Sequence, residues 1–408
     1  MTSRWYRLIP IVFITYSLAF LDRTNFGFAL AGKMGEDLNI TKSMSSLLGS
    51  LFFAGYFLFQ IPGATYASKK SAKKLIFWSL ILWGGLATAT GLVSNFKILV
   101  MVRLLLGIVE SAVMPAMLIL LSRWFTKSER SRANTFLILG NPATMVWMSI
   151  ISGYLVDAVG WRMMFVIEGL PAVIWAFIWW KMIDDRPGDA KWLTQEDLQS
   201  IDANLSMEQK SLKPVKNYAS AFKSPTVILL SLQYALWSIG VYGFAIWLPT
   251  IIKAAPNMSI VETGWLASIP YCLAVIFMLA VSYFSDKTLN RKSFVWPFLL
   301  IGAIGFYASY LIGTSNFWFS FILLSIAGAS MFAPYGPFFA IIPEILPANV
   351  SGGSIALINS LGALGSFVGA FVVGELNART GGFGASYIFM SSSLLISVLL
   401  TLVAVKNK

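Results

Sequence analysis

The 408-residue sequence contains no histidine, a single cysteine and few charged side chains (12%). Without histidine there is no imidazole metal ligand, no histidine general base and no Ser-His-Asp triad. The lone Cys272 excludes an internal disulfide and any cysteine-rich zinc or iron–sulfur site. No phosphate-binding or dinucleotide-binding glycine pattern lies between a strand and a helix. We therefore expect no enzyme, no bound metal and no cofactor.

Apolar side chains are what the sequence has in excess, at 57% of all residues. Soluble domains contain roughly half apolar residues and about a quarter charged ones, so this chain has more apolar surface than a water-soluble core can hide. The sequence predicts an all-α integral membrane protein in contact with the lipid bilayer. Stretches of about 20 apolar residues predict twelve spans: 8–30, 44–66, 75–94, 97–121, 133–156, 163–183, 226–252, 260–283, 294–313, 317–342, 352–375 and 384–405.

The distribution of lysine and arginine predicts the orientation of these spans. Of the 30 basic residues, 22 fall on the side that holds the N-terminus, six fall on the opposite side, and Arg23 and Arg103 fall within spans. Because positive residues concentrate in cytoplasmic loops, both termini are expected in the cytoplasm. The same topology explains the net charge of +12 without a nucleic-acid partner. The short loops favour a bacterial inner membrane.

An internal repeat relates the two halves of the chain. A shift of 218 residues places Lys69 on Lys287 and Lys73 and Lys74 on Arg291 and Lys292. The same shift places Asn141 of the fifth span on Asn359 of the eleventh. Parallel repeats of six spans are a transporter arrangement, in which the substrate is held between the halves.

The predicted domains are therefore two six-helix bundles, 1–183 and 226–408, joined by a linker at 184–225. The linker is the only long polar stretch. It contains an acidic amphipathic segment for which Thr194 is the expected N-cap, followed by Glu196 and Asp197 in the first turn.

Four charged residues fall inside predicted spans: Asp22, Arg23, Arg103 and Glu110. A charge at the bilayer centre costs about 2.5–3.5 kcal/mol, and helix geometry brings these four to neighbouring levels of two helices. One interpretation is a static ion-pair cluster that holds the first and fourth spans together. The other is functional: the carboxylates carry a proton, the arginines bind an anion, and binding of the two is cooperative. Since histidine is absent, a carboxylate is the expected proton carrier.

Several neutral residues are weaker candidates for the same site. Asn141 and Asn359 lie mid-span at equivalent positions, where they would either bind substrate hydroxyls or join helices. Tyr56 would add a phenol to an anion site or simply pack. Aromatic residues that would either wall a cavity or pack are Trp237, Tyr242, Trp247, Tyr335 and Phe338. Two further expectations are that Glu168 pairs with Arg162, and that Pro334-Tyr335-Gly336-Pro337 weakens the tenth span.

The sequence resembles the major facilitator superfamily and, within it, the anion:cation symporter family, over nearly its whole length. Segment 18–25 contains Asp22-Arg23-Thr24-Asn25 and resembles that family's Asp-Arg-x-Asn signature. Segment 103–111 resembles its Arg-x3-Gly-x2-Glu-[AS] stretch. Further similar segments are 124–133, 160–169, 184–187 and 190–193.

The resemblance implies inward, proton-driven uptake of an organic anion by alternating access, with sodium as the driving ion in some members. Asp22 and Glu110 match the family's coupling positions, and Arg23 and Arg103 match positions that contact the substrate carboxylate. Residues that match polar positions lining the site are Asn359, Tyr56 and Asn141.

A loop signature of the wider superfamily, Gly-x3-Asp-Arg-x-Gly-Arg-Lys, occurs unequally in the two halves. The loop between the eighth and ninth spans keeps Asp286, Lys287 and Arg291, which match gating positions. The equivalent loop at 68–74 has no aspartate.

The expected function is thus proton-coupled import of a small organic anion. A hydroxylated sugar acid is favoured because paired asparagines suit hydroxyl groups. The alternatives are an exporter or uniporter of a neutral sugar or drug-like compound, and a membrane sensor that does not transport. A monomer is expected from the superfamily.

Overall fold

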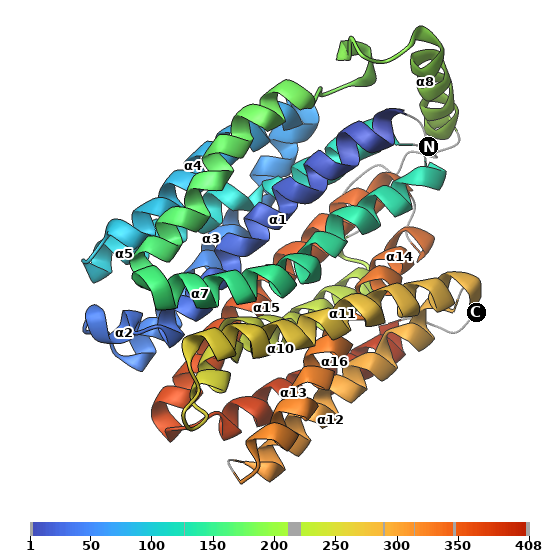
Figure 1. Ribbon diagram of the computed structural model, residues 1–408. Helices are drawn as coiled ribbons and strands as arrows, with labels where there is room; N and C mark the ends of the chain where they lie inside the picture. Colours follow the sequence, from blue (N-terminus) through green and yellow to red (C-terminus); the bar gives the residue numbers. More distant parts are fainter. Residues whose placement is uncertain are drawn as a thin grey trace.

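The computed structural model describes residues 3–125, 127–210, 222–288, 290–313, 315–345 and 348–404, and these residues form helices without any β-strand. Ten of the described segments are long and apolar enough to cross a membrane, and the segment Phe136–Met182 is long enough to cross twice. The expected all-α, multi-pass fold is confirmed. Both chain ends lie at one end of the helical bundle, together with the linker helix α8 (Figure 1). This end is called the terminal side below.

The first half of the chain supplies six spans. Its helices are α1 (Ser3–Ala31), α2 (Met34–Asp37), α3 (Lys42–Lys69), α4 (Ala72–Leu92), α5 (Phe96–Ser111), α6 (Val113–Trp124) and α7 (Lys127–Met182). Helices α5 and α6 form one span with a break at Ala112. Helix α7 contains two spans that turn at Gly160, where φ is 78°. A glycine adopts this left-handed conformation without steric cost.

The second half repeats this arrangement. Its helices are α10 (Pro225–Lys253), α11 (Ile260–Thr288), α12 (Trp296–Ile312), α13 (Phe317–Phe332), α14 (Tyr335–Ile345), α15 (Ala348–Thr380) and α16 (Gly384–Ala404). The tenth span is broken between Phe332 and Tyr335, where the sequence predicts a weak point. Proline prevents a continuous helix there because it lacks an N–H group. Each half therefore contains one interrupted span, α5–α6 or α13–α14.

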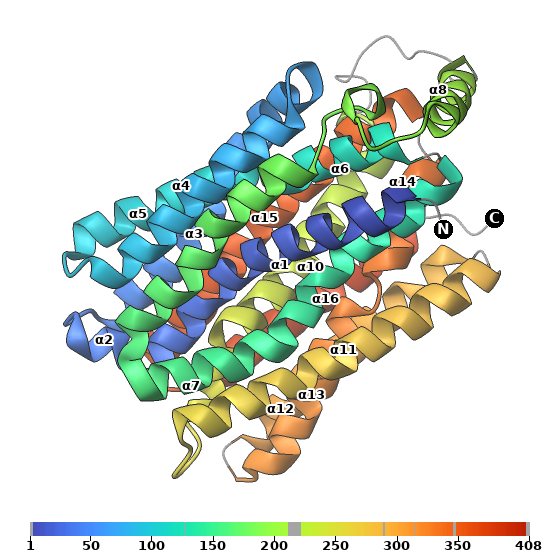
Figure 2. The same cartoon turned by 45° about the horizontal axis from the view of Figure 1, so that its top comes forward.

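Three pairs of helices join the halves: α1 with α10, α3 with α15, and α7 with α11. Figure 2 shows α3 and α15 running side by side in the same part of the bundle. Glycine residues allow the helix backbones of the two halves to approach closely at the helix ends that lie farthest from the terminal side. A Cβ atom on Gly27 would lie 2.4 Å from the Ile246 carbonyl oxygen, and one on Gly264 would lie 2.5 Å from that of Ser149. The backbones of the two halves are therefore in tight contact at these two positions on the side opposite the termini.

On the terminal side, the start of the linker is bound to the first half. The linker contains η1 (Pro187–Asp189) and α8 (Gln195–Lys210), and Thr194 accepts a hydrogen bond from the Asp197 N–H at 3.2 Å, as expected for an N-cap. Asp185 accepts hydrogen bonds from the Ser71 hydroxyl and the Lys73 N–H (3.0 Å). It also lies 3.8 Å from the Arg123 guanidinium. The linker thus supplies the carboxylate that the loop at 68–74 does not contain.

We predict that Asp185→Ala lowers stability by about 1–2 kcal/mol, the usual effect of removing a helix-capping side chain. Thermal unfolding in detergent measures the change. The matched control is Asp189→Ala, because Asp189 is exposed and makes no side-chain hydrogen bond within the described ranges. Equal melting temperatures for the two variants would contradict this capping role.

Candidate functional site

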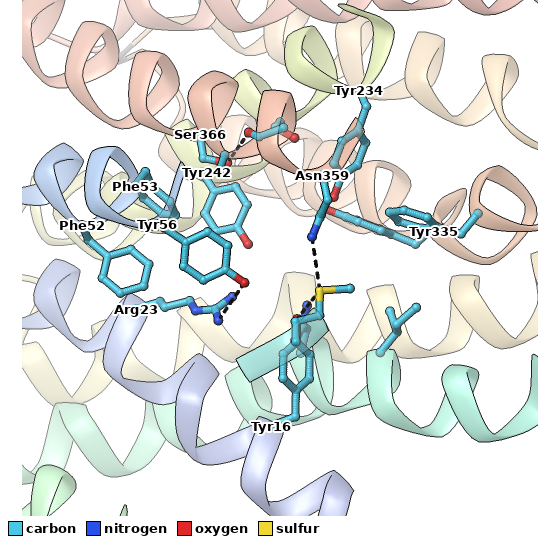
Figure 3. Close-up of a pocket in the computed structure, with 17 residues that line it drawn as sticks. Tyr16, Arg23, Phe52, Phe53, Tyr56, Tyr234, Tyr242, Tyr335, Asn359 and Ser366 are labelled. Atoms are coloured by element: carbon cyan, nitrogen blue, oxygen red, sulfur yellow. Dashed lines mark hydrogen bonds between the residues drawn. The ribbon is translucent and has the colours of Figure 1, made fainter. Parts of the chain in front are cut away.

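A cavity lies between the two halves near the middle of the bundle. Its lining residues are Tyr16, Arg23, Phe52, Phe53, Tyr56, Met114, Ile138, Asn141, Tyr234, Ser238, Tyr242, Tyr335, Phe339, Asn359, Gly362, Ala363 and Ser366. Four of the residues that the sequence predicts for the substrate site are among them: Arg23, Tyr56, Asn141 and Asn359. Both halves contribute side chains, as Figure 3 shows for Arg23 and Asn359.

Among the described residues, Arg23 is the one charged side chain that lines this cavity. Its Nε donates a hydrogen bond to Glu110 Oε2 at 3.0 Å, and its Nη2 donates to the Tyr56 hydroxyl at 3.4 Å. The guanidinium carbon also lies 4.7 Å from the centre of the Tyr56 ring and 5.7 Å from that of Phe52. Aromatic faces stabilise a desolvated cation. Arg23 is therefore fixed in place with part of its hydrogen-bonding capacity available to the cavity.

Glu110 lies behind Arg23 and does not line the cavity. The side chain of Arg23 is 3% exposed and that of Glu110 is 0% exposed, so the ion pair is buried. Glu110 Oε1 has no hydrogen-bond partner among the described residues. Proton binding at Glu110 would remove the negative charge that Arg23 contacts, and a substrate carboxylate could then replace it.

Arg103 and Asp22 are near this pair but do not line the cavity. Arg103 Nε donates to the Leu48 carbonyl at 3.3 Å, and its guanidinium lies 4.5 Å from the centre of the Phe26 ring. Among the four charged residues that the sequence predicts for one site, Arg23 and Glu110 form an ion pair, and Asp22 and Arg103 lie within electrostatic reach of it. Asp22 and Arg23 are adjacent in a helix and point about 100° apart, so Asp22 does not join the pair directly.

The two asparagines lie on opposite halves and both reach the cavity. Asn359 Nδ2 lies 3.5 Å from Met114 Sδ, a weak acceptor, and Asn141 Oδ1 has no hydrogen-bond partner within the described part of the chain. Both amides can therefore form stronger hydrogen bonds with a ligand.

Five tyrosines line the cavity, of which Tyr56, Tyr242 and Tyr335 were candidates from the sequence. Tyr16, Tyr234, Ser238 and Ser366 were missed. The sequence did contain a signal for three cavity residues, because Tyr234, Ser238 and Tyr242 are spaced four apart and share one face of α10.

The remaining aromatic candidates pack inside the second half. Trp237 Nε1 donates to the Met331 carbonyl at 3.0 Å and Trp247 Nε1 to the Ala370 carbonyl at 2.8 Å. Neither tryptophan lines the cavity, and neither does Phe338.

The expected pairing of Glu168 with Arg162 is wrong. Arg162 Nη1 donates to the carbonyls of Gly91 (3.2 Å) and Val93 (3.0 Å), while Glu168 Oε1 accepts from the Ser152 hydroxyl. Residues six apart in a helix point in widely different directions, which explains the separation.

The gating positions of the second half lie at the end of α11 and in η2 (Arg291–Phe294). Arg291 Nη1 donates to the Ser285 hydroxyl at 3.1 Å, and Lys287 is exposed. The side chain of Asp286 lies outside the described residues. Their role in gating stays a prediction.

The cavity is narrow. Its volume is about 40 Å³. That is room for a few water molecules. A sugar acid would therefore require the halves to move apart.

Comparison with known proteins identifies the family. The model of the Major Facilitator Superfamily matches residues 12–370. The chain belongs to this superfamily. It is 31% identical to a protein of Agrobacterium vitis whose name marks it as a tartrate transporter, with 98% of this chain and 90% of that one covered. It is 32% identical to a quinolone resistance transporter of Acinetobacter baumannii, with 97% and 92% covered.

The fold is also that of a solved superfamily transporter. The inward-open structure of the xylose transporter XylE from E. coli superposes with a TM-score of 0.76 at 14% identity, covering 98% of this chain and 97% of that one. The chain is thus a transporter and not an enzyme, and its relatives fit the resemblance to anion:cation symporters.

We predict that Arg23→Met and Glu110→Gln each lower stability by about 3–5 kcal/mol, because each leaves a buried polar partner without its counter-charge. The double variant should lose less than the sum of the two, as measured by thermal unfolding in one detergent. The pair formed by the exposed Arg379 and the half-buried Glu375, 2.8 Å apart at the end of α15, is the control. Additive losses for Arg23 and Glu110 would show that the buried pair is not coupled.

Proposed function

We propose that this superfamily member imports a small organic anion together with a proton. The observation that carries the proposal is the position of Arg23. It is the one charged residue lining the cavity in the described part of the chain, and a buried carboxylate, Glu110, balances it from behind. Once that carboxylate is protonated, a cavity with one cation fits an anionic ligand better than a neutral one.

The coupling follows from competition for Arg23. With Glu110 ionised, the ion pair is neutral and an anion gains little from approaching it. When Glu110 accepts a proton, Arg23 is left without a counter-ion, and a substrate carboxylate supplies one. Binding of the proton and of the anion is then mutually favourable by linkage. Arg103 and Asp22, within electrostatic reach of this pair, are proposed to adjust its charge balance, with Asp22 as a second coupling carboxylate.

We propose a hydroxylated carboxylate, such as a sugar acid or tartrate, as the substrate class. The two cavity asparagines, Ser238 and the tyrosine hydroxyls surround the space beside Arg23 with donors and acceptors. Such groups recognise hydroxyls with directional hydrogen bonds. The tartrate transporter among the relatives agrees with this class.

Alternating access would proceed between the two bundles, with both termini in the cytoplasm and the chain in an inner membrane. The contacts of Gly27 and Gly264 close the side opposite the termini. The state described here would therefore be closed to the outside. Substrate release to the cytoplasm would need the helices on the terminal side to separate further.

An aromatic drug is the rival substrate, because one relative is a quinolone resistance transporter and the cavity has many rings. Quinolones such as norfloxacin also carry a carboxyl group, but on a large aromatic ring system and without the hydroxyl groups of tartrate and gluconate. Norfloxacin is therefore the probe that separates an aromatic substrate from a hydroxylated one.

We predict that, in proteoliposomes, tartrate or gluconate uptake is driven by an inward proton gradient and falls at least about tenfold in Arg23→Ala, a loss of one charge-assisted hydrogen-bonding partner. Arg379→Ala, which removes an exposed arginine, is the control and should transport normally. Uptake that is unaffected by Arg23→Ala, or proton-driven movement of norfloxacin only, would contradict the proposal.

We further predict that Glu110→Gln keeps exchange of labelled for unlabelled anion but loses accumulation against a gradient. Glutamine imitates the protonated acid, so the anion still binds while the proton is no longer needed. Parallel exchange and gradient-driven assays on the same liposomes measure the two. Normal accumulation by Glu110→Gln would remove Glu110 from the coupling mechanism.

A further inference from the structure

A second group of acidic and amide side chains is buried in the first half, away from the cavity. Glu168 on α7 is 5% exposed, and Asp22 and Asn25 on α1 are 1% and 0% exposed. None of the three lines the cavity. One oxygen of each has no hydrogen-bond partner among the described residues: Glu168 Oε2, Asp22 Oδ2 and Asn25 Oδ1. Buried oxygens without partners are costly, so this group requires an explanation.

Asn25 connects the two carboxyl groups. Its Nδ2 donates to Asp22 Oδ1 at 3.5 Å, and Asn25 also interacts with the Glu168 carboxyl. Asp22 and Asn25 are three residues apart on α1 and therefore share a face of the helix. Two carboxyl groups this close in an apolar interior do not both stay ionised without cations.

Ser152 provides a partner that suits both protonation states of Glu168. Its hydroxyl oxygen lies 2.5 Å from Glu168 Oε1 and 3.1 Å from Met148 Sδ. A serine hydroxyl has one hydrogen to donate. When it donates to the sulfur, the short contact with Glu168 needs a proton on the acid. When the hydroxyl rotates to Glu168, it stabilises the carboxylate instead.

The groups around Asp22 and Glu168 indicate that a bound proton neutralises these carboxyl groups. From α4, the neutral Trp83 indole N–H faces the Asp22 carboxyl. From α5, Arg103 and Glu110 act on Asp22, while Arg23 on α1 is paired with Glu110. Arg162 on α7 binds backbone carbonyls. No described lysine or arginine forms an ion pair with Glu168 or Asp22.

We propose that Glu168 is a third proton site of the transport cycle, linked through Asn25 to Asp22 and separate from the anion cavity. This inference rests on the proposed proton symport. In this proposal, groups on α7 and α1 of the first half bind the additional proton. Because α1 contacts α10, and α7 contacts α11, these proton-binding groups lie on two of the three first-half helices that contact the second half.

The transport test compares the proton-to-tartrate ratio of the wild type, Glu168→Gln and Glu262→Gln. The ratio comes from the tartrate gradient that just balances an imposed pH gradient in proteoliposomes. Glu262 is exposed at the start of α11 and serves as the control. Glu168→Gln should lose one proton per tartrate while still exchanging tartrate, and Glu168→Asp should restore the ratio. An unchanged ratio in Glu168→Gln, or a wild-type ratio set by sodium instead of pH, would overturn the inference.

A measurement without substrate separates this inference from the proposed function. Infrared difference spectra of the purified protein between near-neutral and alkaline pH report the carbonyl band of carboxyl groups that are still protonated near neutrality, since exposed carboxyl groups are ionised at both pH values. We expect part of this band to disappear in Glu168→Gln and to persist in Glu262→Gln and Glu168→Asp. If the band is lost as expected while the wild type moves no tartrate, the proton site stands and the proposed substrate class fails. If Glu168→Gln gives the wild-type band, the site is refuted whatever the transport result.

Discussion

The buried ion pair between Arg23 and Glu110 is the interaction on which the site depends. A single charge in the hydrocarbon region is costly, and a buried pair is tolerated when its remaining hydrogen-bonding groups are also compensated. Here the Tyr56 hydroxyl and the aromatic faces of Tyr56 and Phe52 supply part of that compensation. The pair therefore forms at one location, at the wall of the cavity between the halves.

The two halves share a fold but differ in chemistry. Each has six spans and one interrupted helix facing the centre, whereas a buried ion pair is found, within the described ranges, in the first half. The second half contributes neutral groups to the cavity, among them Tyr234, Tyr242 and Asn359. In our account, the first half thus binds charge and the second recognises the uncharged part of the substrate. Separating these tasks lets the proton act on the anion's carboxylate without disturbing the contacts to its hydroxyls.

Much of the fold could be predicted from the sequence, because apolar length and loop charge are local properties. The spans, the weak point near Pro334 and the helix start after Thr194 all follow from local patterns. The repeat offset pointed to Asn141 and Asn359, which both reach the cavity. The direction of individual side chains was harder to predict from the sequence. Asp22 and Arg23 are adjacent and were expected to act together, but neighbouring residues in a helix point in different directions.

Long-range contacts were not predictable from one sequence. Asp185 binds Lys73 and Arg123 across more than 60 residues of chain, and no local pattern marks that contact. The link from Asn25 to Glu168 likewise depends on how α1 packs against α7. The shared helix face of Tyr234, Ser238 and Tyr242, in contrast, could have been predicted from their four-residue spacing.

Proton uptake on anion binding tests the central claim most directly. Purified protein in weakly buffered detergent, near neutral pH and with a pH indicator, is mixed with tartrate, and binding is followed in parallel by calorimetry. If the anion replaces Glu110 at Arg23, binding takes up a proton from solution, and the uptake disappears in Glu110→Gln although tartrate still binds. Tartrate binding without proton uptake in the wild type would contradict the account.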